Sequence, residues 1–223
     1  MAAPPIQLPL PLGGRAAPTF DDFLVGDNVA VMAHLRGLQM PGAPVYLWGP
    51  PGCGKSHLLQ ALAGGVRRAG QLACDFEPGR VLPADATLAL IDDAETLDDA
   101  AQADAFRWFV DAATAGVQIV AAGRLPPVDL PLREDLRTRL GWGPTFAVQP
   151  LGEAQVRAVL RREADRRGIF LADEVMDYVL ARFTRDLRHL MQLLDHLDRF
   201  ALARSRHVTV PLVRQMLDEN LPL

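Results

Sequence analysis

Eight consecutive residues of this sequence, from Gly49 to Ser56, have the types and spacing of a phosphate-binding loop. They fit the pattern G-x-x-x-x-G-K-[ST] without a mismatch. Glycines let the backbone approach an anion, Lys55 supplies a full positive charge, and the Ser56 hydroxyl is suited to ligate magnesium. We therefore predict a nucleotide phosphate site. The alternative is a glycine-rich turn with a chance Lys-Ser pair.

The residues on either side of this loop favour the phosphate site. Val45 to Trp48 is short, apolar and β-prone, and His57 to Ala63 has a helical pattern. The loop thus joins a strand to a helix, where unpaired N–H groups and the helix dipole attract an anion. The residues predicted to contact the nucleotide here are Gly49, Pro51, Gly52, Cys53, Gly54, Lys55, Ser56 and His57.

Two acids form a second candidate site. Asp92 and Asp93 end the apolar, strand-like run that begins at Thr87. The carboxyl ends of parallel strands are where such sheets bind ligands. We expect Asp92 to hold magnesium, directly or through water, and Asp93 to polarise an attacking water. The alternative is two acids that open a surface loop.

The order of predicted elements indicates an α/β fold. β-prone runs at 45–48, 72–76, 87–93, 117–123 and 145–148 alternate with helical patterns that begin near 29 and cover 57–69, 98–115 and 132–140. This alternation is typical of a parallel sheet with helices on both faces. After Pro150 only helical patterns follow. We predict an extended tail over 1–18, a nucleotide-binding domain over 19–150 and a small helical domain over 151–223.

Several local features refine this outline. Asp27 or Asn28 is suited to cap the helix that follows, and Asp173 and Thr209 are suited to cap two helices of the second domain. The connection from 77 to 86 has ten residues, fewer than a parallel crossover usually needs. The helix over 98–115 is predicted to bury one face made of Phe106, Phe109, Val110 and Ala113, and a later one a stripe of Leu187, Leu190, Met191, Leu194, Leu197 and Ala201.

Composition limits the classes of protein. The 223 residues are 49% hydrophobic, enough for a sizeable core. No apolar run reaches the roughly 18 residues of a membrane span, and the N-terminus lacks the order of a signal peptide, so we expect a cytoplasmic protein. The two cysteines indicate neither a metal site nor a disulfide framework. With a net charge of -4, the chain as a whole lacks the positive charge expected of a dedicated DNA-binding protein.

The N-terminal tail contains a possible docking sequence. Residues 1 to 18 carry five prolines, and Gln7 to Leu12 alternates leucine with proline. Prolines hold the backbone extended, and the leucines can anchor in an apolar groove. From the residues alone, a disordered tail and a docking peptide are equally consistent with this segment.

Taken in order, a phosphate loop, a strand ending in two acids, an arginine-bearing segment and a helical C-terminal domain resemble an AAA+ ATPase. The chain is more closely similar to the regulatory inactivators of the bacterial replication initiator DnaA. The resemblance covers nearly the whole chain. It is carried by Thr19 to Asn28, by the Walker B residues Leu90 to Asp93, by an arginine-finger box at Leu136 to Gly143, by the second sensor at Arg185 to Arg188, and by the clamp-binding peptide at Gln7 to Leu12.

The resemblance implies further roles. Val25 and Gly26 would close around the base, and Arg188 would reach the phosphates. Arg139, placed at a subunit boundary, would neutralise charge developing on a γ-phosphate bound to a neighbouring molecule. Without the resemblance, Arg139 also fits a surface arginine in a charged helix. The residues expected to bind the sliding clamp are Gln7, Leu8, Leu10 and Leu12.

Two departures from the family bear on activity. The family usually has a polar Asp or Asn after the fourth strand to orient water, whereas Gly123-Arg124 stands here, so we expect weak or no ATP turnover. DnaA carries a helix-turn-helix domain beyond the helical lid, whereas this sequence stops at Leu223. We therefore expect contact with DNA only through the clamp.

The predicted function is a regulator of replication initiation. It would bind ADP or ATP with Mg2+, form a homo-oligomer such as a dimer, dock on the DNA polymerase sliding clamp and stimulate ATP hydrolysis by DnaA. No membrane is expected among its partners. One alternative is an AAA+ ATPase that loads a helicase or remodels a partner by its own hydrolysis. Another is a non-catalytic adaptor whose nucleotide only stabilises the fold.

Overall fold

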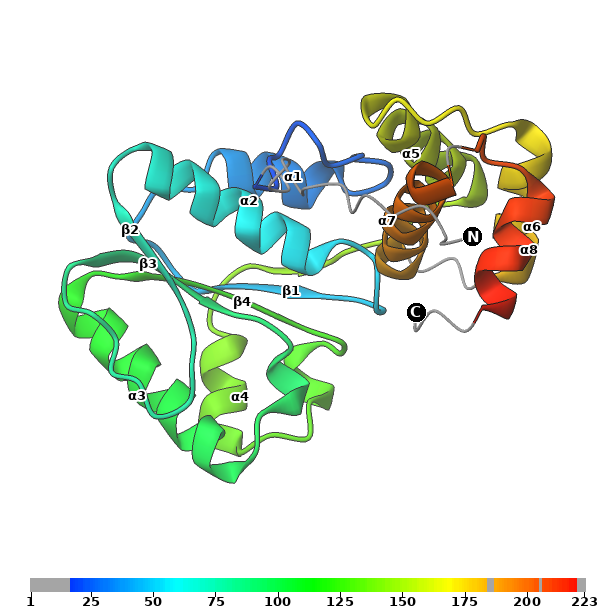
Figure 1. Cartoon of the computed structure of the whole chain (residues 1–223). Helices are drawn as coiled ribbons and strands as arrows, with labels where there is room; N and C mark the ends of the chain where they lie inside the picture. The colour runs from blue at the N-terminus through cyan, green and yellow to red at the C-terminus, as the bar shows by residue number, and fades with distance from the viewer. Residues whose placement is uncertain (1–16, 184–186, 205, 220–223) are drawn as a thin grey trace, which may run out of the picture. The chain divides into compact units, whose positions relative to one another are not determined.

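The computed structural model describes residues 17–183, 187–204 and 206–219, which form two compact units (Figure 1). Residues 17–150 form a parallel sheet flanked by helices, and the described residues from 151 onward form only helices. The predicted fold class, an α/β nucleotide-binding domain followed by a small helical lid, is confirmed. Within the described ranges, no helix has the length and apolarity needed to cross a bilayer.

The sheet places three strand ends side by side. Its strands are β1 (Val45–Trp48), β2 (Leu72–Asp75), β3 (Ala86–Ile91), β4 (Gln118–Gly123) and β5 (Thr145–Ala147). In the described part of the chain they pair in the parallel order β2-β3-β4-β1-β5. Because β4 lies between β3 and β1, the residues that follow β1, β3 and β4 emerge at the same edge of the sheet.

Alternation along the strands divides the core of this unit into two layers. Helices α1 (Val29–Arg36) and α2 (Lys55–Arg68) cover one face, and α3 (Asp99–Ala115) and α4 (Glu134–Leu140) cover the other (Figure 1). Successive strand residues point to opposite faces. The strand residues buried under α1 and α2 include Val45, Leu47, Leu88, Leu90, Val120 and Ala122, and those under α3 and α4 include Tyr46, Ala89, Ile91, Ile119 and Ala121.

The face that α3 buries differs from the predicted one. Of the four residues expected to be inside, Phe109 is buried, Phe106 is half-buried, and Val110 and Ala113 are exposed. The helix is turned so that Trp108 enters the core, where its indole N–H donates to the carbonyl of Arg80 at 2.8 Å. The other buried apolar residues of α3 are Ala101, Ala105 and Ala112. Their small side chains let the helix approach the sheet closely.

The short connection between β2 and β3 is held by α3. Residues 76–85, all described, form no helix. The carbonyl of Arg80 accepts from Trp108, the Gly79 N–H donates to the Asp104 carboxylate at 2.6 Å, and Leu82 is buried in the core on this side. Ten residues therefore suffice, because the crossover runs over α3 rather than forming a helix of its own.

The C-terminal unit packs helices α5 (Glu153–Arg166), α6 (Asp173–Arg182), α7 (Leu187–Arg204) and α8 (Val210–Asp218) around one core. The predicted stripe of α7 contributes to this core, with Leu190, Leu194, Leu197 and Ala201 buried. Thr209 caps α8 as expected, since its hydroxyl accepts from the Leu212 N–H. The expected cap of α6 is wrong: Ala172 holds the cap position, and Asp173 lies in the first turn, where it pairs with Arg161.

The expected side-chain cap at the start of α1 is also wrong. Asn28 holds the cap position, but its side chain makes no capping hydrogen bond. Instead its amide donates to the Gln149 carbonyl at 3.0 Å and accepts from the Gln149 N–H at 2.7 Å. Asn28 is buried, with 2% of its surface exposed. Asn28 therefore fastens the chain before α1 to the chain that follows β5.

Replacing Asn28 should destabilise the N-terminal unit. Asn28→Ala leaves one donor and one acceptor of Gln149 without partners, and we expect a loss of about 3 kcal/mol in the free energy of unfolding. The neighbouring Asp27 is exposed. Asp27→Ala is the matched control and should change stability by less than about 0.5 kcal/mol. Urea unfolding followed by tryptophan fluorescence suits this comparison, because Trp48, Trp108 and Trp142 all lie in this unit. Equal losses in the two variants would contradict the assignment.

Candidate nucleotide site and surface arginine

The predicted phosphate loop runs from the end of β1 into α2, which begins at Lys55. Its glycines have positive φ angles of 153° at Gly49, 76° at Gly52 and 105° at Gly54. A Cβ on Gly54 would lie 2.6 Å from a ring carbon of Phe23, and one on Gly49 would lie 2.4 Å from a backbone carbonyl oxygen. Positive φ and close approach therefore both require glycine at these two positions.

Lys55 is buried at the base of this loop, with 6% of its surface exposed. Its ammonium donates to the carbonyls of Gly49 at 2.8 Å and Pro50 at 3.1 Å, and lies 3.8 Å from the Cys53 sulfur. Among the residues that the structure describes, Lys55 forms no ion pair with a carboxylate. A buried cation held by neutral acceptors favours an anion nearby. The loop therefore fits a phosphate group.

Two further loop residues have side chains engaged within the protein. Cys53 is buried, and burial raises the pKa of its thiol, which favours the neutral form. The His57 ring donates through Nε2 to the Thr19 carbonyl at 2.9 Å and lies 5.7 Å from the Phe23 ring. A phosphate would therefore meet the backbone of His57 rather than its imidazole.

The structure brings the loop serine and the strand acid together. The Ser56 hydroxyl hydrogen-bonds to the Asp92 carboxylate, whose Oδ1 also accepts from the Asp93 N–H at 2.9 Å. Asp92 is exposed as a residue, yet partial burial of its carboxyl raises the pKa above its ordinary value of 3.8. A hydroxyl and a carboxylate are oxygen ligands of the kind that Mg2+ prefers. Ser56 and Asp92 therefore fit a magnesium ion.

Asp93 has an unusual backbone. Its φ of 47° is the only positive value at a non-glycine residue in the described part of the chain. This left-handed conformation costs about 1 kcal/mol or more. The residue is exposed at the edge where β1, β3 and β4 end. Strain of this kind is concentrated at functional sites, which agrees with a role for Asp93 there.

Sequence reasoning missed Glu95, which lies two residues beyond Asp93. Its side chain is 13% exposed, pairs with Arg124 Nε at 3.0 Å and accepts from the Arg124 backbone N–H at 3.1 Å. Burial, together with the charge of Glu95, raises the pKa of Tyr46 beneath it. The available signal was an acid close behind the Walker B strand and an arginine close behind the next strand. The place of the expected polar sensor is therefore taken by an ion pair.

The N-terminal segment of the unit touches the phosphate loop. Phe23 lies against Gly54, and Thr19 accepts from His57. Val25 is half-buried against the core under α1 and α2, and Gly26, with φ of 50°, forms the turn before that helix. The segment to which we assigned base binding is thus held next to the loop, while contact of Val25 and Gly26 with a base stays a prediction.

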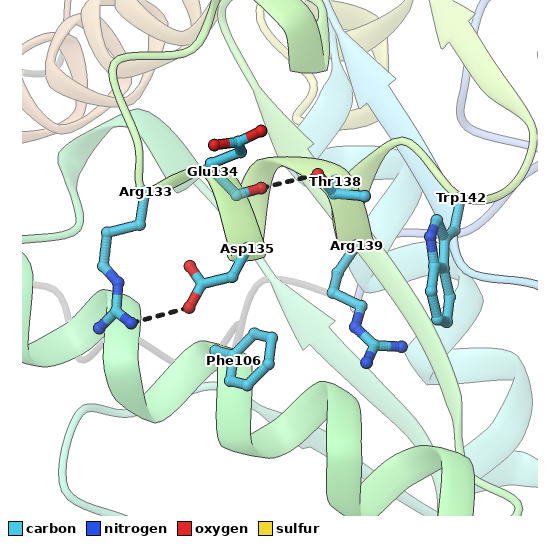
Figure 2. Close-up of a pocket in the computed structure, with 7 residues that line it drawn as sticks. All are labelled: Phe106, Arg133, Glu134, Asp135, Thr138, Arg139 and Trp142. Carbon is cyan, nitrogen blue, oxygen red and sulfur yellow. Dashed lines mark hydrogen bonds and ion pairs between the residues drawn. The ribbon is translucent and has the colours of Figure 1, made fainter.

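Arg139 lies apart from the phosphate loop, on α4. It borders a surface pocket of about 720 Å³ to which the loop contributes no residue (Figure 2). Its guanidinium carbon is 3.8 Å from the centroid of the Trp142 ring and 5.7 Å from that of Phe106. The pocket is lined by Phe106, Arg133, Glu134, Asp135, Thr138, Arg139 and Trp142. Arg139 is half-buried and borders this pocket, while Leu136 and Leu140 of the same helix enter the core.

Some predicted site residues cannot be placed. The clamp-binding residues Gln7, Leu8, Leu10 and Leu12 lie outside the described residues, as does Arg185 of the second sensor. Arg188 falls in the first turn of α7, in the C-terminal unit, and its side chain is also outside the description. Their roles remain expectations from the sequence.

The strand order, the loop between β1 and α2 and the acids after β3 together are typical of a phosphate-loop α/β domain that binds nucleotides. Residues 153–217 match the family model described as the lid domain of Hda. The C-terminal helical unit is therefore similar to the lid domain of Hda.

Solved structures with the same fold include three described here. Domain III of the Thermotoga maritima initiation protein DnaA has a TM-score of 0.76 at 22% identity, over 90% of this chain and 95% of that one. AMPPCP-bound DnaA from Aquifex aeolicus has a TM-score of 0.65 at 22% identity, over 80% and 64%. The Thermotoga maritima RuvB branch migration motor has a TM-score of 0.64 at 14% identity, over 91% and 72%.

The raised pKa of Asp92 makes a prediction about stability. Because the folded-state pKa exceeds 3.8, the stability linked to the neutral carboxyl is present below that pH and is lost as the pH rises through the raised pKa. Asp92→Asn stays neutral and can still accept from Ser56. It should unfold at a higher temperature than the wild type at pH 7, and the difference should shrink as the pH is lowered. A lower melting temperature at pH 7 would contradict this.

The same variant tests the metal site. If Asp92 ligates magnesium, Asp92→Asn should reduce the gain in ADP affinity that Mg2+ confers by about tenfold or more. Binding measured calorimetrically with Mg2+ and with EDTA separates this effect from nucleotide binding itself. Asp75 is an acid at the end of β2, away from β1 and β4 in the strand order. Asp75→Asn serves as the control and should retain the full magnesium effect.

Proposed function

We propose that this protein holds an adenine nucleotide and inactivates the initiator DnaA by stimulating its ATP hydrolysis. The observation that carries the proposal is the position of Arg139. Its guanidinium is at the surface, away from the chain's own phosphate loop, and has no hydrogen bond or ion pair among the described residues. The Hda-type lid and the DnaA-like domain support DnaA as the partner.

The nucleotide would be ADP or ATP with Mg2+. Lys55 would bind the phosphates, and Ser56 and Asp92 would hold the metal, which neutralises phosphate charge when bound. The AMPPCP in a DnaA structure of the same fold supports an adenine nucleotide. Val25, Gly26 and Arg188 would complete the site. The nucleotide then stabilises the folded AAA+ domain, because binding to the folded form alone favours it.

Arg139 would act on a different molecule. In ATP-bound DnaA, negative charge develops on the γ-phosphoryl group as the bond to the leaving oxygen breaks. A guanidinium presented from a neighbouring subunit neutralises that charge, an effect of about a thousandfold or more in comparable systems. Its planar fork can donate two hydrogen bonds to phosphate oxygens, which a lysine cannot. The protein would therefore supply one residue of its partner's active site.

The remaining partners follow from the sequence. Residues Gln7, Leu8, Leu10 and Leu12 would dock on the sliding clamp, so that DnaA is inactivated where replication has begun. A homodimer is the proposed resting form. These proposals derive from the resemblance stated above and from the tail's alternation of leucine with proline.

A specific observation favours a second candidate function, an autonomous ATPase that loads a helicase or remodels a partner. The Ser56–Asp92 hydrogen bond and the intact phosphate loop are parts that hydrolysis requires. Against it, the Glu95–Arg124 pair stands where a water-orienting sensor is expected. We therefore place this function second.

The first test is DnaA ATP turnover with the clamp loaded on DNA. Arg139→Ala should lower the stimulated rate to nearly that of DnaA alone, because the guanidinium that would neutralise the γ-phosphoryl charge is removed. Arg204 is the matched control: it also stacks on an aromatic ring, Phe200, but is paired with Glu219 at 2.6 Å. Arg204→Ala should stimulate normally. Full stimulation by Arg139→Ala would end the proposal.

Clamp docking is tested in the same assay. A Gln7→Ala, Leu8→Ala double variant should lose stimulation that depends on loaded clamp, since its anchors are gone. A Pro4→Ala, Pro5→Ala variant alters the same tail outside the docking sequence and should stimulate as the wild type does. Loss in neither double variant would remove the clamp from the proposal and leave the action on DnaA standing.

Intrinsic turnover separates the two candidate functions. The regulator should hydrolyse ATP alone well below about 1 s⁻¹, the low end for ordinary enzymes. A loader should exceed that rate and lose it in Asp93→Ala. Fast, Asp93-dependent hydrolysis by the isolated protein would favour the second function. Undiminished DnaA inactivation by Lys55→Ala without nucleotide binding would instead favour a non-catalytic adaptor.

A further inference from the structure

Arg139 is half-buried and has no hydrogen bond or ion pair with the described residues, yet two aromatic rings hold its side chain in a defined orientation. Figure 2 shows its side chain next to that of Trp142, with Phe106 of α3 on the other side of the guanidinium. At 3.8 Å from the ring centroid, the cation lies within the distance at which an aromatic face attracts it. The face of the guanidinium is thus covered, while the hydrogen-bonding edge is not used by any described residue.

Arg204 and Arg139 both stack on an aromatic ring but differ in their ion pairing. Arg204 stacks on Phe200 at 3.6 Å, but its guanidinium also pairs with Glu219. In the pocket itself, Asp135 pairs with Arg133 at 2.7 Å and so does not neutralise Arg139. Arg139 therefore stacks on aromatic rings, and none of the described residues accepts a hydrogen bond from its guanidinium N–H groups. These N–H groups can donate to an acceptor on another molecule.

Trp142 itself is placed to hold Arg139. It lies just beyond Gly141, the cap residue of α4, and its backbone N–H donates to the Arg139 carbonyl at 3.3 Å. The side chain is 59% exposed, so burial in the core does not account for a tryptophan at this position. On the other side, α4 is tied to α3 because the Arg133 N–H donates to the side chain of buried Gln102 at 2.8 Å. The two rings that contact the guanidinium are thus held in place by α3, which carries Phe106, and by α4, which precedes Trp142.

We propose that Trp142 is a positioning residue that holds the Arg139 guanidinium by its face and leaves the N–H fork free for a phosphate group on a neighbouring molecule. This inference rests on the proposed function, because the phosphate is the γ-phosphate of ATP bound to DnaA. Holding the side chain in advance reduces the conformational entropy lost when it meets the phosphate. Trp142 acts through Arg139 and does not itself touch the phosphate.

The test measures DnaA ATP turnover against the concentration of the full chain. Trp142→Leu, which keeps apolar bulk and removes the π face, should lower the maximal stimulated rate by about 2- to 5-fold. The half-saturating concentration should stay the same, because docking does not depend on the indole. Trp142→Phe, which keeps an aromatic face, should recover most of the rate. In an Arg139→Ala background, Trp142→Leu should cause no further loss.

The possible outcomes separate this inference from the proposed function. A wild-type maximal rate in Trp142→Leu overturns it, while loss of stimulation in Arg139→Ala keeps the proposed function intact. A raised half-saturating concentration at an unchanged maximal rate also overturns it, since Trp142 would then be a docking contact. Normal stimulation by Arg139→Ala overturns both. Thermal melting shows whether Trp142→Leu is folded, and if it is not, the Trp142→Phe and Trp142→Tyr rates decide whether the aromatic face is required.

Discussion

The buried charge of Lys55 is the constraint on which the N-terminal unit depends. An ammonium with 6% exposure must be surrounded by acceptors, and the carbonyls of Gly49 and Pro50 provide them. The loop can turn its carbonyls inward only because glycines accept its positive φ angles. The Gly49 N–H then donates to the carbonyl of Gly123 at 3.2 Å, which ties the loop to β4. The phosphate site and the end of β4 are therefore built as one structure.

Because the phosphate loop is hydrogen-bonded to Gly123, the Glu95–Arg124 pair lies next to that loop. Gly123 has no room for a side chain, since a Cβ there would lie 2.1 Å from the Tyr46 hydroxyl. The next residue, Arg124, is held by Glu95 through both its backbone and its side chain. The chain after β4 is thus directed by an ion pair next to the phosphate loop. The expectation of weak turnover by the chain itself rests on this arginine, which is already engaged at a place where a water-orienting group is expected.

Much of the fold could be predicted because the motifs and hydrophobic patterns that indicate it lie within short stretches of sequence. The phosphate loop, the strand ending in Asp92 and the helical lid all depend on residues adjacent in the chain, and their elements lie where the spacing indicated. The failures concern orientation. The predicted buried face of α3 differs from the observed one, in which Trp108 is buried and donates to a carbonyl of the β2–β3 connection. Asn28 was assigned as a cap because its type suits one, whereas its partner, Gln149, is 121 residues away.

Motif spacing and hydrophobic period act within one element or one turn, and they therefore predict that a phosphate loop, a parallel sheet and a helical lid follow one another. They do not predict which side chains meet across elements: Glu95 with Arg124, Ser56 with Asp92, and Arg139 with the rings of Trp142 and Phe106. Such contacts depend on how the helices rotate and approach the sheet. Packing sets that geometry through the volumes of buried side chains, which no local pattern of residues expresses.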